Sequence, residues 1–293
     1  MLQRLVALPS VLRSSVRVGL PAALAMLALL AAATARADDR APFDLRYGMY
    51  WGGLHVADVA LRYQPNGTVY RSDFRIQTVG MAEMLLRYRG EASSEGQLTS
   101  EGRLNGADRL LPEAYRFNGR SRKATTMAEV LFDPHTGAAV HVESRKRGKS
   151  RGTDVPQELW VDVLDPLTAF LHLRQELSAL RSGELQQVVL PVFDGRRRYD
   201  LVAEPGARES LSAAGRDWDA LHIDLTVRPV AGFDEEDWEE AGHGTGGMRL
   251  EALVSDDARM IPLRIKTRNA AVNVVFHLRQ DCFGYEPCAA AAG

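Results

Sequence analysis

The sequence has few cysteines, no marked excess of charge and, beyond its first 37 residues, no long apolar run. Only two of its 293 residues are cysteines, which excludes a disulfide-dense scaffold. The formal net charge is −2, and this near balance argues against a general nucleic-acid binder. No later stretch is apolar over the roughly 20 residues that a membrane-spanning helix needs. With 45% hydrophobic residues, the chain can still bury a substantial core.

The first 37 residues are typical of a cleavable signal peptide. Basic residues precede an apolar segment from Gly19 to Ala33, and Ala35-Arg36-Ala37 provides a small-x-small cleavage site before Asp38. The apolar segment is short for a membrane span, and no cysteine follows it for lipid attachment. We therefore expect residues 1–37 to be removed and the protein to act outside the cytoplasm. Removal of four arginines leaves 36 − 4 = 32 basic against 38 acidic side chains, or −6.

Residues 166–181 form the strongest predicted helix. Asp165 is a favoured N-cap, Pro166 suits the first helical position, and Gly183 is a favoured C-terminal stop. On this helix, His172 is expected to be a hydrogen-bonded structural histidine, and Arg174 or Gln175 to be more exposed. The apolar residues that recur at helical spacing, which we expect to face the core, are Leu167, Phe170, Leu171, Leu177 and Leu180.

Most of the remaining chain consists of short apolar or alternating runs typical of antiparallel strands. Gly52-Gly53 and Asp194-Gly195 are favoured hairpin turns, and Val79 to Leu86 is expected to form one short helical turn. Residues 231–247 are acidic and then rich in glycine, which predicts an exposed loop. The predicted fold class is therefore mainly β, with a large antiparallel sheet wrapped against one long helix. We expect a single domain over residues 38–288 and a disordered tail over 289–293.

The two cysteines, Cys282 and Cys288, lie close together near the C-terminus. In an oxidising compartment, two cysteines with five residues between them predict a disulfide. Two thiolates alone do not complete a zinc shell, and no histidine lies nearby in the sequence. A disulfide that ties down the chain end is the expected arrangement.

No motif in the sequence predicts a catalytic residue, a metal site or a cofactor. The spacing G-x-G-x-x-G occurs at residues 242–247, but it follows an acidic run at 234–240 that would repel the phosphates of a dinucleotide. The seven histidines show no metal or triad spacing, and no G-x-S-x-G motif is present. An enzyme is therefore the less favoured class, although a site built from distant residues stays an alternative.

Basic residues gather when the turn at residues 134–137 closes a hairpin. With Asp133 opposite Ala138, Lys123 is expected near Gly148. A solubilising hairpin end is one interpretation, and contact with anionic lipid headgroups or an acidic partner is the other. The eight residues of this candidate anion-binding patch are Arg120, Arg122, Lys123, Arg145, Lys146, Arg147, Lys149 and Arg151.

Four short motifs occur in an order that resembles a known family. They are Tyr47-Gly48-x-x-Trp51-Gly52-Gly53-x-x-Val56-Ala57, Leu111-Pro112-Glu113-Ala114-Tyr115, Asp165-Pro166-Leu167-Thr168, and the segment from Val254 to Leu263. Their order resembles the bacterial envelope family called domain of unknown function 3108, over about Phe43 to Leu278. The resemblance implies a periplasmic location and a strongly curved, half-barrel-like sheet with a helix on its concave side, similar to lipoprotein-carrier folds. It implies no catalytic residue, because the family has no assigned activity.

The function expected from this fold is non-enzymatic binding or carrying of an apolar, lipid-like ligand, or of an envelope partner, between sheet and helix. The reason is that a curved sheet offers a larger concave apolar face than one helix covers. One alternative is a structural or interaction protein of envelope biogenesis with a filled core, and another is an envelope hydrolase. A cavity lined by Leu, Val and Phe would favour the carrier, and a filled interior with an exposed apolar patch would favour the interaction protein.

Overall fold

In the computed structural model, the described residues are 41–104, 107–234, 247–267 and 273–284. The chain divides after Ala37 into two units, and all of these residues belong to the second unit, Asp38–Gly293. The predicted signal peptide, the predicted tail and most of the predicted acidic loop lie outside the described residues. Cys282 lies in a strand, but Cys288 also lies outside them, so the disulfide stays a prediction.

Fourteen antiparallel strands form one open sheet, which confirms the mainly β prediction. Strands β8 to β1 lie side by side in reverse chain order, and β1 then pairs with β14, from which the order runs back to β9. Strands β8 and β9 are therefore the two edges. The bounds are β1 Phe43–Trp51, β2 Leu54–Asn66, β3 Val69–Thr78, β4 Arg89–Leu104, β5 Ala107–Arg120, β6 Thr125–Phe132, β7 Ala139–Lys146, β8 Lys149–Ser150, β9 Val188–Phe193, β10 Arg198–Ala213, β11 Arg216–Ala231, β12 Met248–Ser255, β13 Pro262–Thr267 and β14 Val274–Phe283.

The described helices are a short one, α2 (Gly80–Leu85), a 3-10 turn, η2 (Gln157–Leu159), and the long α3 (Pro166–Ser182). Helix α3 confirms the prediction to within one residue. The Asp165 side chain accepts hydrogen bonds from two backbone N–H groups of the first turn, and Gly183 ends the helix in the left-handed region at φ 81°. None of the helices in the described ranges is long and apolar enough to cross a membrane.

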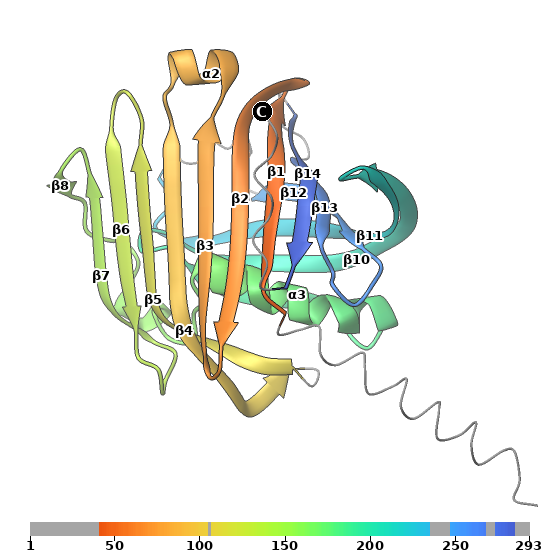
Figure 1. Cartoon of the computed structure of the whole chain (residues 1–293). Helices are drawn as coiled ribbons and strands as arrows, with labels where there is room; N and C mark the ends of the chain where they lie inside the picture. Colours follow the sequence, from red (N-terminus) through yellow and green to blue (C-terminus); the bar gives the residue numbers. More distant parts are fainter. Residues whose placement is uncertain (1–40, 105–106, 235–246, 268–272, 285–293) are drawn as a thin grey trace, which may run out of the picture. The chain divides into compact units, whose positions relative to one another are not determined.

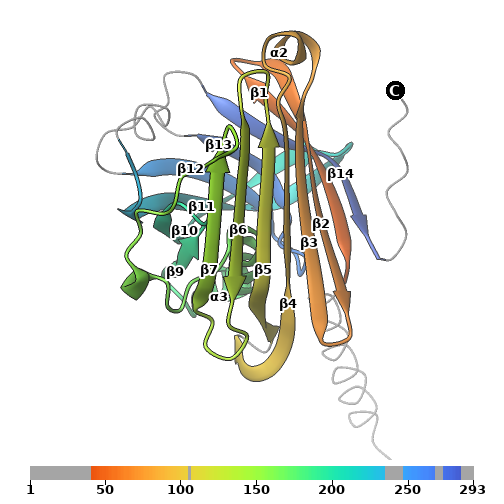
Figure 2. The same ribbon diagram turned by 90° about the vertical axis from the view of Figure 1, so that its left-hand side faces the viewer.

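Helix α3 lies on the concave side of the sheet. It contacts β3, β4 and β5 on one flank and β9 and β10 on the other. Figure 1 shows β10, β11 and β12 crossing behind the first strands of the sheet, with α3 beside them, and Figure 2 gives the same arrangement from the side. Eleven of the 17 residues of α3 are buried. Of the five predicted core residues, Phe170 is half-buried, and the buried ones are Leu167, Leu171, Leu177 and Leu180.

Arg174 does not lie on an exposed side of the helix, contrary to the expectation. It is only 7% exposed, its Nε donates to the carbonyl oxygen of Arg259 at 2.6 Å, and its guanidinium lies 5.2 Å from the centre of the Phe43 ring. Gln175 is half-buried and donates to the carbonyl oxygen of Asp108 at 3.0 Å. The expectation was wrong for Arg174, because the sheet covers both flanks of α3 and the helix has no broad solvent face. Gln175 is more exposed than Leu171, as expected.

Strand β5 and the turn after β9 differ from what the sequence pattern alone indicates. Strand β5 begins at Ala107 and continues through Pro112, because a register shift places this proline opposite Gly96. A Cβ atom at Gly96 would lie 2.1 Å from the carbonyl oxygen of Leu111, so only glycine fits there. At the Asp194-Gly195 turn, β9 ends at Phe193 and its partner begins at Arg198, which gives a four-residue loop in place of the expected two-residue turn.

Candidate functional site

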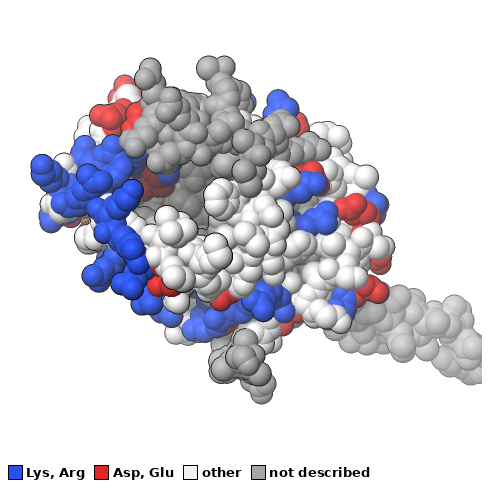
Figure 3. All heavy atoms as spheres, turned by 90° about the horizontal axis from the view of Figure 1, so that it is seen from above, with Lys and Arg blue, Asp and Glu red and all other residues white. Residues whose placement is uncertain are grey.

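Four arginines line one pocket at the end of the sheet that carries α2. The pocket has a volume of about 670 Å³, and we call it the arginine pocket. Figure 3 looks down on this end of the molecule and shows lysines and arginines gathered along one side of it. Its lining residues are Arg87, Arg89, Arg120 and Arg122, together with Glu83, Met84 and Ser121.

Backbone pairing brings these arginines together from segments about 30 residues apart in sequence. Arg89 on β4 is the direct antiparallel partner of Arg120 on β5, so both side chains leave the same face of the sheet. The N–H of Arg122 donates to the carbonyl oxygen of Leu86 at 3.1 Å, which ties the turn after β5 to the end of α2. Arg87 adopts φ 47°, in the left-handed region, so the backbone turns sharply from α2 into β4.

The arginine pocket carries an uncompensated positive charge. Within the described residues, none of its four guanidinium groups forms a hydrogen bond or an ion pair. Glu83 is the one carboxylate in the lining, and it accepts a hydrogen bond from the Thr78 hydroxyl at 2.6 Å. Four arginines and one glutamate give +3. Like charges directly opposite each other on a sheet are unfavourable, so this arrangement favours an anion in the pocket.

The predicted hairpin register is correct to within one residue. Lys146 pairs with Thr126, and a register shift at Leu131/Phe132 moves the pairing by one position from the expected one. The eight predicted basic residues thus come to one end of the sheet. They do not form one surface, because alternate residues on a strand point to opposite faces.

The predicted patch divides into four parts. Arg120 and Arg122 lie in the arginine pocket, whereas Arg145 lies beside Glu143, with which it forms an ion pair. Lys146 and Arg151 line a second pocket of about 330 Å³. The exposed residues near the strand ends are Lys123, Arg147 and Lys149.

The second pocket is basic, but carboxylates compensate it. Arg196 and Arg197, from the loop after β9, also line it. Asp234 lies 3.3 Å from Arg196 and 3.8 Å from Arg151, and Asp194 lies 3.1 Å from Arg197. The arginine pocket is therefore the better candidate for an anion.

Reasoning from the sequence missed half of the arginine pocket. Arg87 and Arg89 belong to a different hairpin from the predicted patch, so only the pairing of β4 with β5 places them beside Arg120. The segment Met84-Leu85-Leu86-Arg87-Tyr88-Arg89 carries a signal that was available: an apolar run leads directly into two arginines on alternate positions.

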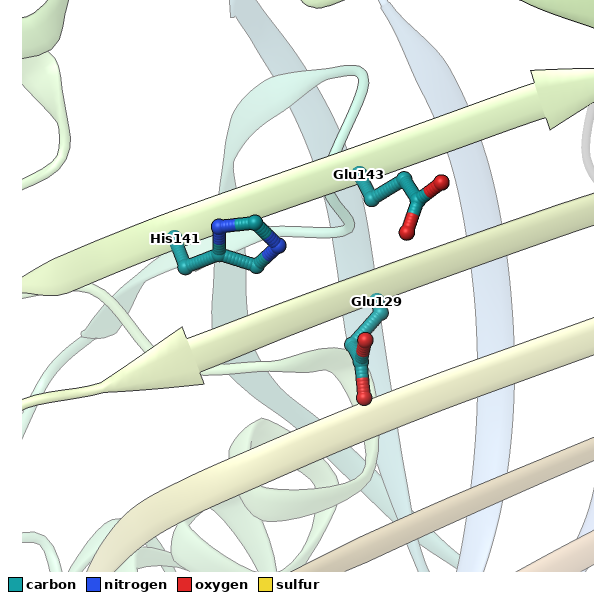
Figure 4. A group of neighbouring side chains, drawn as sticks. All are labelled: Glu129, His141 and Glu143. Carbon is teal, nitrogen blue, oxygen red and sulfur yellow. The ribbon is translucent and has the colours of Figure 1, made fainter.

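A second cluster consists of Glu129, His141 and Glu143 on neighbouring strands β6 and β7. Figure 4 shows the three side chains together, and their potential ligand atoms lie within 4.8 Å of one another. Both carboxylates already have a cationic partner. Glu129 accepts a hydrogen bond from Arg116 Nε at 2.8 Å, and Glu143 accepts one from Arg145 Nε. A guanidinium group thus holds one oxygen of each carboxylate, so the two glutamates belong to a surface ion-pair network.

A buried polar network surrounds the start of α3. Asp165 is fully buried and its carboxylate accepts hydrogen bonds from the hydroxyls of Thr168 at 2.5 Å and Ser94 at 2.8 Å. The Tyr70 hydroxyl is 2.6 Å from the Thr168 hydroxyl. Burial raises the pKa of Asp165, because the charged form loses its hydration. Through Tyr70 and Ser94, this network anchors the start of the helix to β3 and β4.

His172 is a structural histidine. It is buried, and its Nε2–H donates to the carbonyl oxygen of Leu110 at 2.8 Å. Burial lowers the pKa of His172, which favours the neutral ring. This agrees with the expectation for this position.

A further pocket, of about 680 Å³, lies around the turn between β2 and β3, at the other end of the first hairpins. Both arginines in its lining are paired with carboxylates: Arg62 lies 2.8 Å from Asp44, and Arg71 contacts Asp73 and Glu95. Another pocket lies beside Phe74 and Phe117. No residue of α3 lines any of these four pockets.

Comparison with known proteins identifies a family and a fold. The model of a family described as "Protein of unknown function (DUF3108)" matches residues 46–278, which confirms the resemblance found in the motifs. No curated protein matches the chain.

Solved structures were compared with the chain, and their sequence identity to it is low. A beta-barrel-like protein of the domain of unknown function DUF1849 from Brucella abortus superposes with a TM-score of 0.51 and 12% identity, covering 84% of this chain and 99% of that one. A structure from Parabacteroides distasonis described as "a putative lipoprotein" has a TM-score of 0.34 and 7% identity, covering 82% of this chain and 94% of that one. The first of these supports the fold.

Proposed function

Because the chain belongs to DUF3108, a family of proteins of unknown function, we propose its role from its own surface. The protein is a non-enzymatic interaction protein of the bacterial envelope with a filled core, and it binds a phosphate-bearing group in the arginine pocket. The observation that carries this proposal is that four arginines share one pocket and that none has a carboxylate partner among the described residues.

Phosphate suits this pocket for chemical reasons. Guanidinium groups donate paired, planar hydrogen bonds that match phosphate oxygens, and they stay protonated at all physiological pH values. With Arg89 and Arg120 directly opposite each other, a bound phosphate can accept hydrogen bonds from both strands. The repulsion between the two cations then becomes attraction for a shared anion.

The carrier alternative receives less support from the interior. Between the sheet and α3, the space that a carried ligand would need holds packed side chains, among them Leu167, Leu171 and Phe193. None of the four pockets described above contains a residue of α3. A filled core with binding on the outside fits the interaction protein better.

Export from the cytoplasm is part of this proposal. The basic start, the short apolar segment and the Ala35-Arg36-Ala37 site support removal of residues 1–37 by a signal peptidase. N-terminal sequencing of the protein from a periplasmic fraction should then begin at Asp38. A chain that retains Met1 would contradict this part of the proposal.

The test of anion binding uses tripolyphosphate as a soluble probe in isothermal titration calorimetry. The parent protein should bind it, and affinity should fall with salt, because exposed charges are screened beyond about 8 Å at physiological ionic strength. The double variant Arg89→Gln/Arg120→Gln should lose about tenfold or more in affinity, at roughly 1 kcal/mol for each cationic contact.

A matched control removes the same charge from another part of the sheet. Arg208 and Arg228 are exposed like the pocket arginines, but they are paired with Asp256 at 2.7 Å and Asp200 at 2.9 Å. The variant Arg208→Gln/Arg228→Gln should bind tripolyphosphate as the parent does. Equal losses in both variants would mean that net charge, and not the pocket, attracts the anion.

A further inference from the structure

Helix α2 is an apolar tip that nothing in the described protein covers. None of its six residues is buried, and Met81, Met84 and Leu85 are 74%, 71% and 70% exposed. Leu86, the residue after the helix, is exposed as well. Since apolar side chains of this size are normally buried, four of them in one short segment mark an interaction surface.

The fold holds this tip away from the core. Gly80 has φ 56° and Arg87 has φ 47°, so the backbone turns sharply at both ends of the helix. Figure 1 shows α2 as a cap above the ends of β3 and β4. The N–H of Val79 donates to the carbonyl oxygen of Val56 at 2.9 Å, which fixes the tip to β2.

A second apolar group lies at the same end of the sheet. The turn between β1 and β2 carries Trp51 and Leu54, and both are exposed. Because Thr78, the last residue of β3, pairs with Ala57, this turn extends past the end of β3 on the side where α2 sits. Helix α2 and the turn between β1 and β2 therefore lie at the same end of the strands (Figure 1).

The arginine pocket lies directly beneath this apolar tip. Met84 itself lines the pocket, and the carbonyl oxygen of Leu86 is bonded to the N–H of Arg122. From the tip toward the sheet, the order is therefore an apolar cap followed by a layer of four arginines. A bilayer surface presents the complementary order, with anionic phosphates outside and the acyl chains behind them.

We infer that this end of the molecule docks on a membrane whose lipids are anionic. The inference rests on the proposed function, because the arginine pocket supplies the headgroup contact. Met81, Met84 and Leu85 enter the boundary between headgroups and acyl chains, and the arginines then stand at the level of the phosphates. Methionine suits this role because its flexible, polarisable side chain adapts to an irregular surface.

A soluble acidic partner explains only part of this surface. Such a partner would satisfy the arginines, but it gives no reason for apolar side chains to protrude beyond them. Glu83 is the one acidic residue of α2, and its carboxylate is held by the Thr78 hydroxyl. The lipid surface accounts for the apolar tip and the cations with one occupant.

Co-sedimentation with vesicles tests the inference on the protein without residues 1–37. The vesicles contain equal parts of phosphatidylglycerol and phosphatidylethanolamine, and phosphatidylcholine vesicles serve for comparison. The parent should sediment with the anionic vesicles only. The tip variant, Met81→Ser/Leu85→Ser/Leu86→Ser, replaces three exposed side chains that do not line the arginine pocket. It should lose about tenfold or more in partitioning, because burial of each such side chain is strongly favourable.

A matched control replaces three exposed apolar residues elsewhere in the chain. Val140, Val161 and Val189 are 61%, 54% and 43% exposed and are far in sequence from the tip. The variant Val140→Ser/Val161→Ser/Val189→Ser should partition onto vesicles as the parent does. Circular dichroism of every variant at the assay temperature checks that the fold is retained.

The probes separate failure of this inference from failure of the proposed function. If the inference holds, the tip variant binds tripolyphosphate like the parent but loses the vesicles, whereas Arg89→Gln/Arg120→Gln loses both. A parent that binds tripolyphosphate and ignores anionic vesicles overturns membrane docking, keeps the proposed function and directs attention to a soluble acidic partner. A tip variant that binds vesicles as the parent does also overturns docking through α2. Absence of binding to either probe overturns both.

Insertion depth provides an independent measurement. In the variant Met84→Trp, the new indole should be quenched by vesicles that carry brominated acyl chains, and the quenching should exceed that of the parent. Equal quenching in the two proteins would mean that α2 stays in water and that binding is electrostatic only.

Discussion

The replacement Asp165→Ala should strongly destabilise the fold, because this carboxylate has two tasks at the start of α3. Its Oδ1 accepts hydrogen bonds from the backbone N–H groups of Leu167 and Thr168 at 2.9 and 3.1 Å. Its Oδ2 accepts the hydroxyls of Thr168 and Ser94 at 2.5 and 2.8 Å. Alanine keeps the backbone in place but removes all four acceptor contacts.

The magnitude follows from these two tasks. Loss of a helix N-cap costs about 0.5–2 kcal/mol. A buried donor left without an acceptor costs about 1–3 kcal/mol. The Ser94 and Thr168 hydroxyls are 3.0 Å apart, so without Asp165 one of them can donate to the other, but the second has lost its acceptor. The expected loss for Asp165→Ala is therefore about 2–4 kcal/mol. Asp165→Asn keeps one acceptor oxygen and removes a buried charge, so its loss should be about 1 kcal/mol.

Urea denaturation followed by far-UV circular dichroism measures both variants against the parent. The reasoning requires equal m-values, so that a change in midpoint reports a change in the free energy of unfolding. A loss below about 1 kcal/mol for Asp165→Ala would refute the idea that the network anchors the helix. Equal losses for the Ala and Asn variants would show that the cap and the hydroxyl acceptors are not the source of the stability.

Two further predictions concern a histidine and the chain end. Burial lowers the pKa of His172 in the folded state, so as the pH falls the unfolded state binds a proton before the folded state does. The contribution of neutral His172 to the free energy of unfolding should therefore be complete above about pH 6.5 and should decrease as the pH falls toward 5. Urea midpoints at pH 7 and pH 5 should therefore differ less in His172→Gln, which keeps an N–H donor near the Leu110 carbonyl, and equal pH dependence in both proteins would contradict this reasoning. A Cys282–Cys288 disulfide should contribute about 2 kcal/mol by chain entropy, and thiol counting on denatured, unreduced protein should find no reactive thiol, whereas two thiols would exclude it.

Local signals made much of the fold predictable. Strand β9 (Val188–Phe193) and strand β12 (Met248–Ser255) coincide with short apolar runs, and turn residues mark the ends of such runs in the sequence. Helix α3 was predictable from its cap and its stop, Asp165 and Gly183, since both act within one turn of the chain. The extent of a strand was less predictable where it depends on residues distant in sequence. Strand β5 continues through Pro112 only because Gly96 on the neighbouring strand accommodates the bulge.

The candidate site was predictable only in part. The register from the turn at 134–137 placed the predicted basic residues at one end of the sheet, because hairpin pairing follows from the turn. The register alone did not show which of these residues are neutralised. Arg145 is paired with Glu143, whereas Arg120 has no carboxylate partner among the described residues. The face on which a side chain lies and the acids that neutralise it depend on several strands at once.

The amino-acid sequence by itself determined the class of the fold, the long helix α3 and the family, because turn residues, helix caps and apolar spacing act between near neighbours. Only the tertiary structure decided that Arg87 and Arg89 join Arg120 and Arg122 in one pocket, and that the apolar residues of α2 stand above them in solvent. The physical reason is that residues distant in sequence decide both properties. The neighbouring strands either supply a carboxylate that neutralises an arginine or do not, and they either cover an apolar side chain or leave it in solvent. For the same reason, the burial of Arg174 followed from the wrapping of the sheet around both flanks of α3 and not from the pattern of the helix itself.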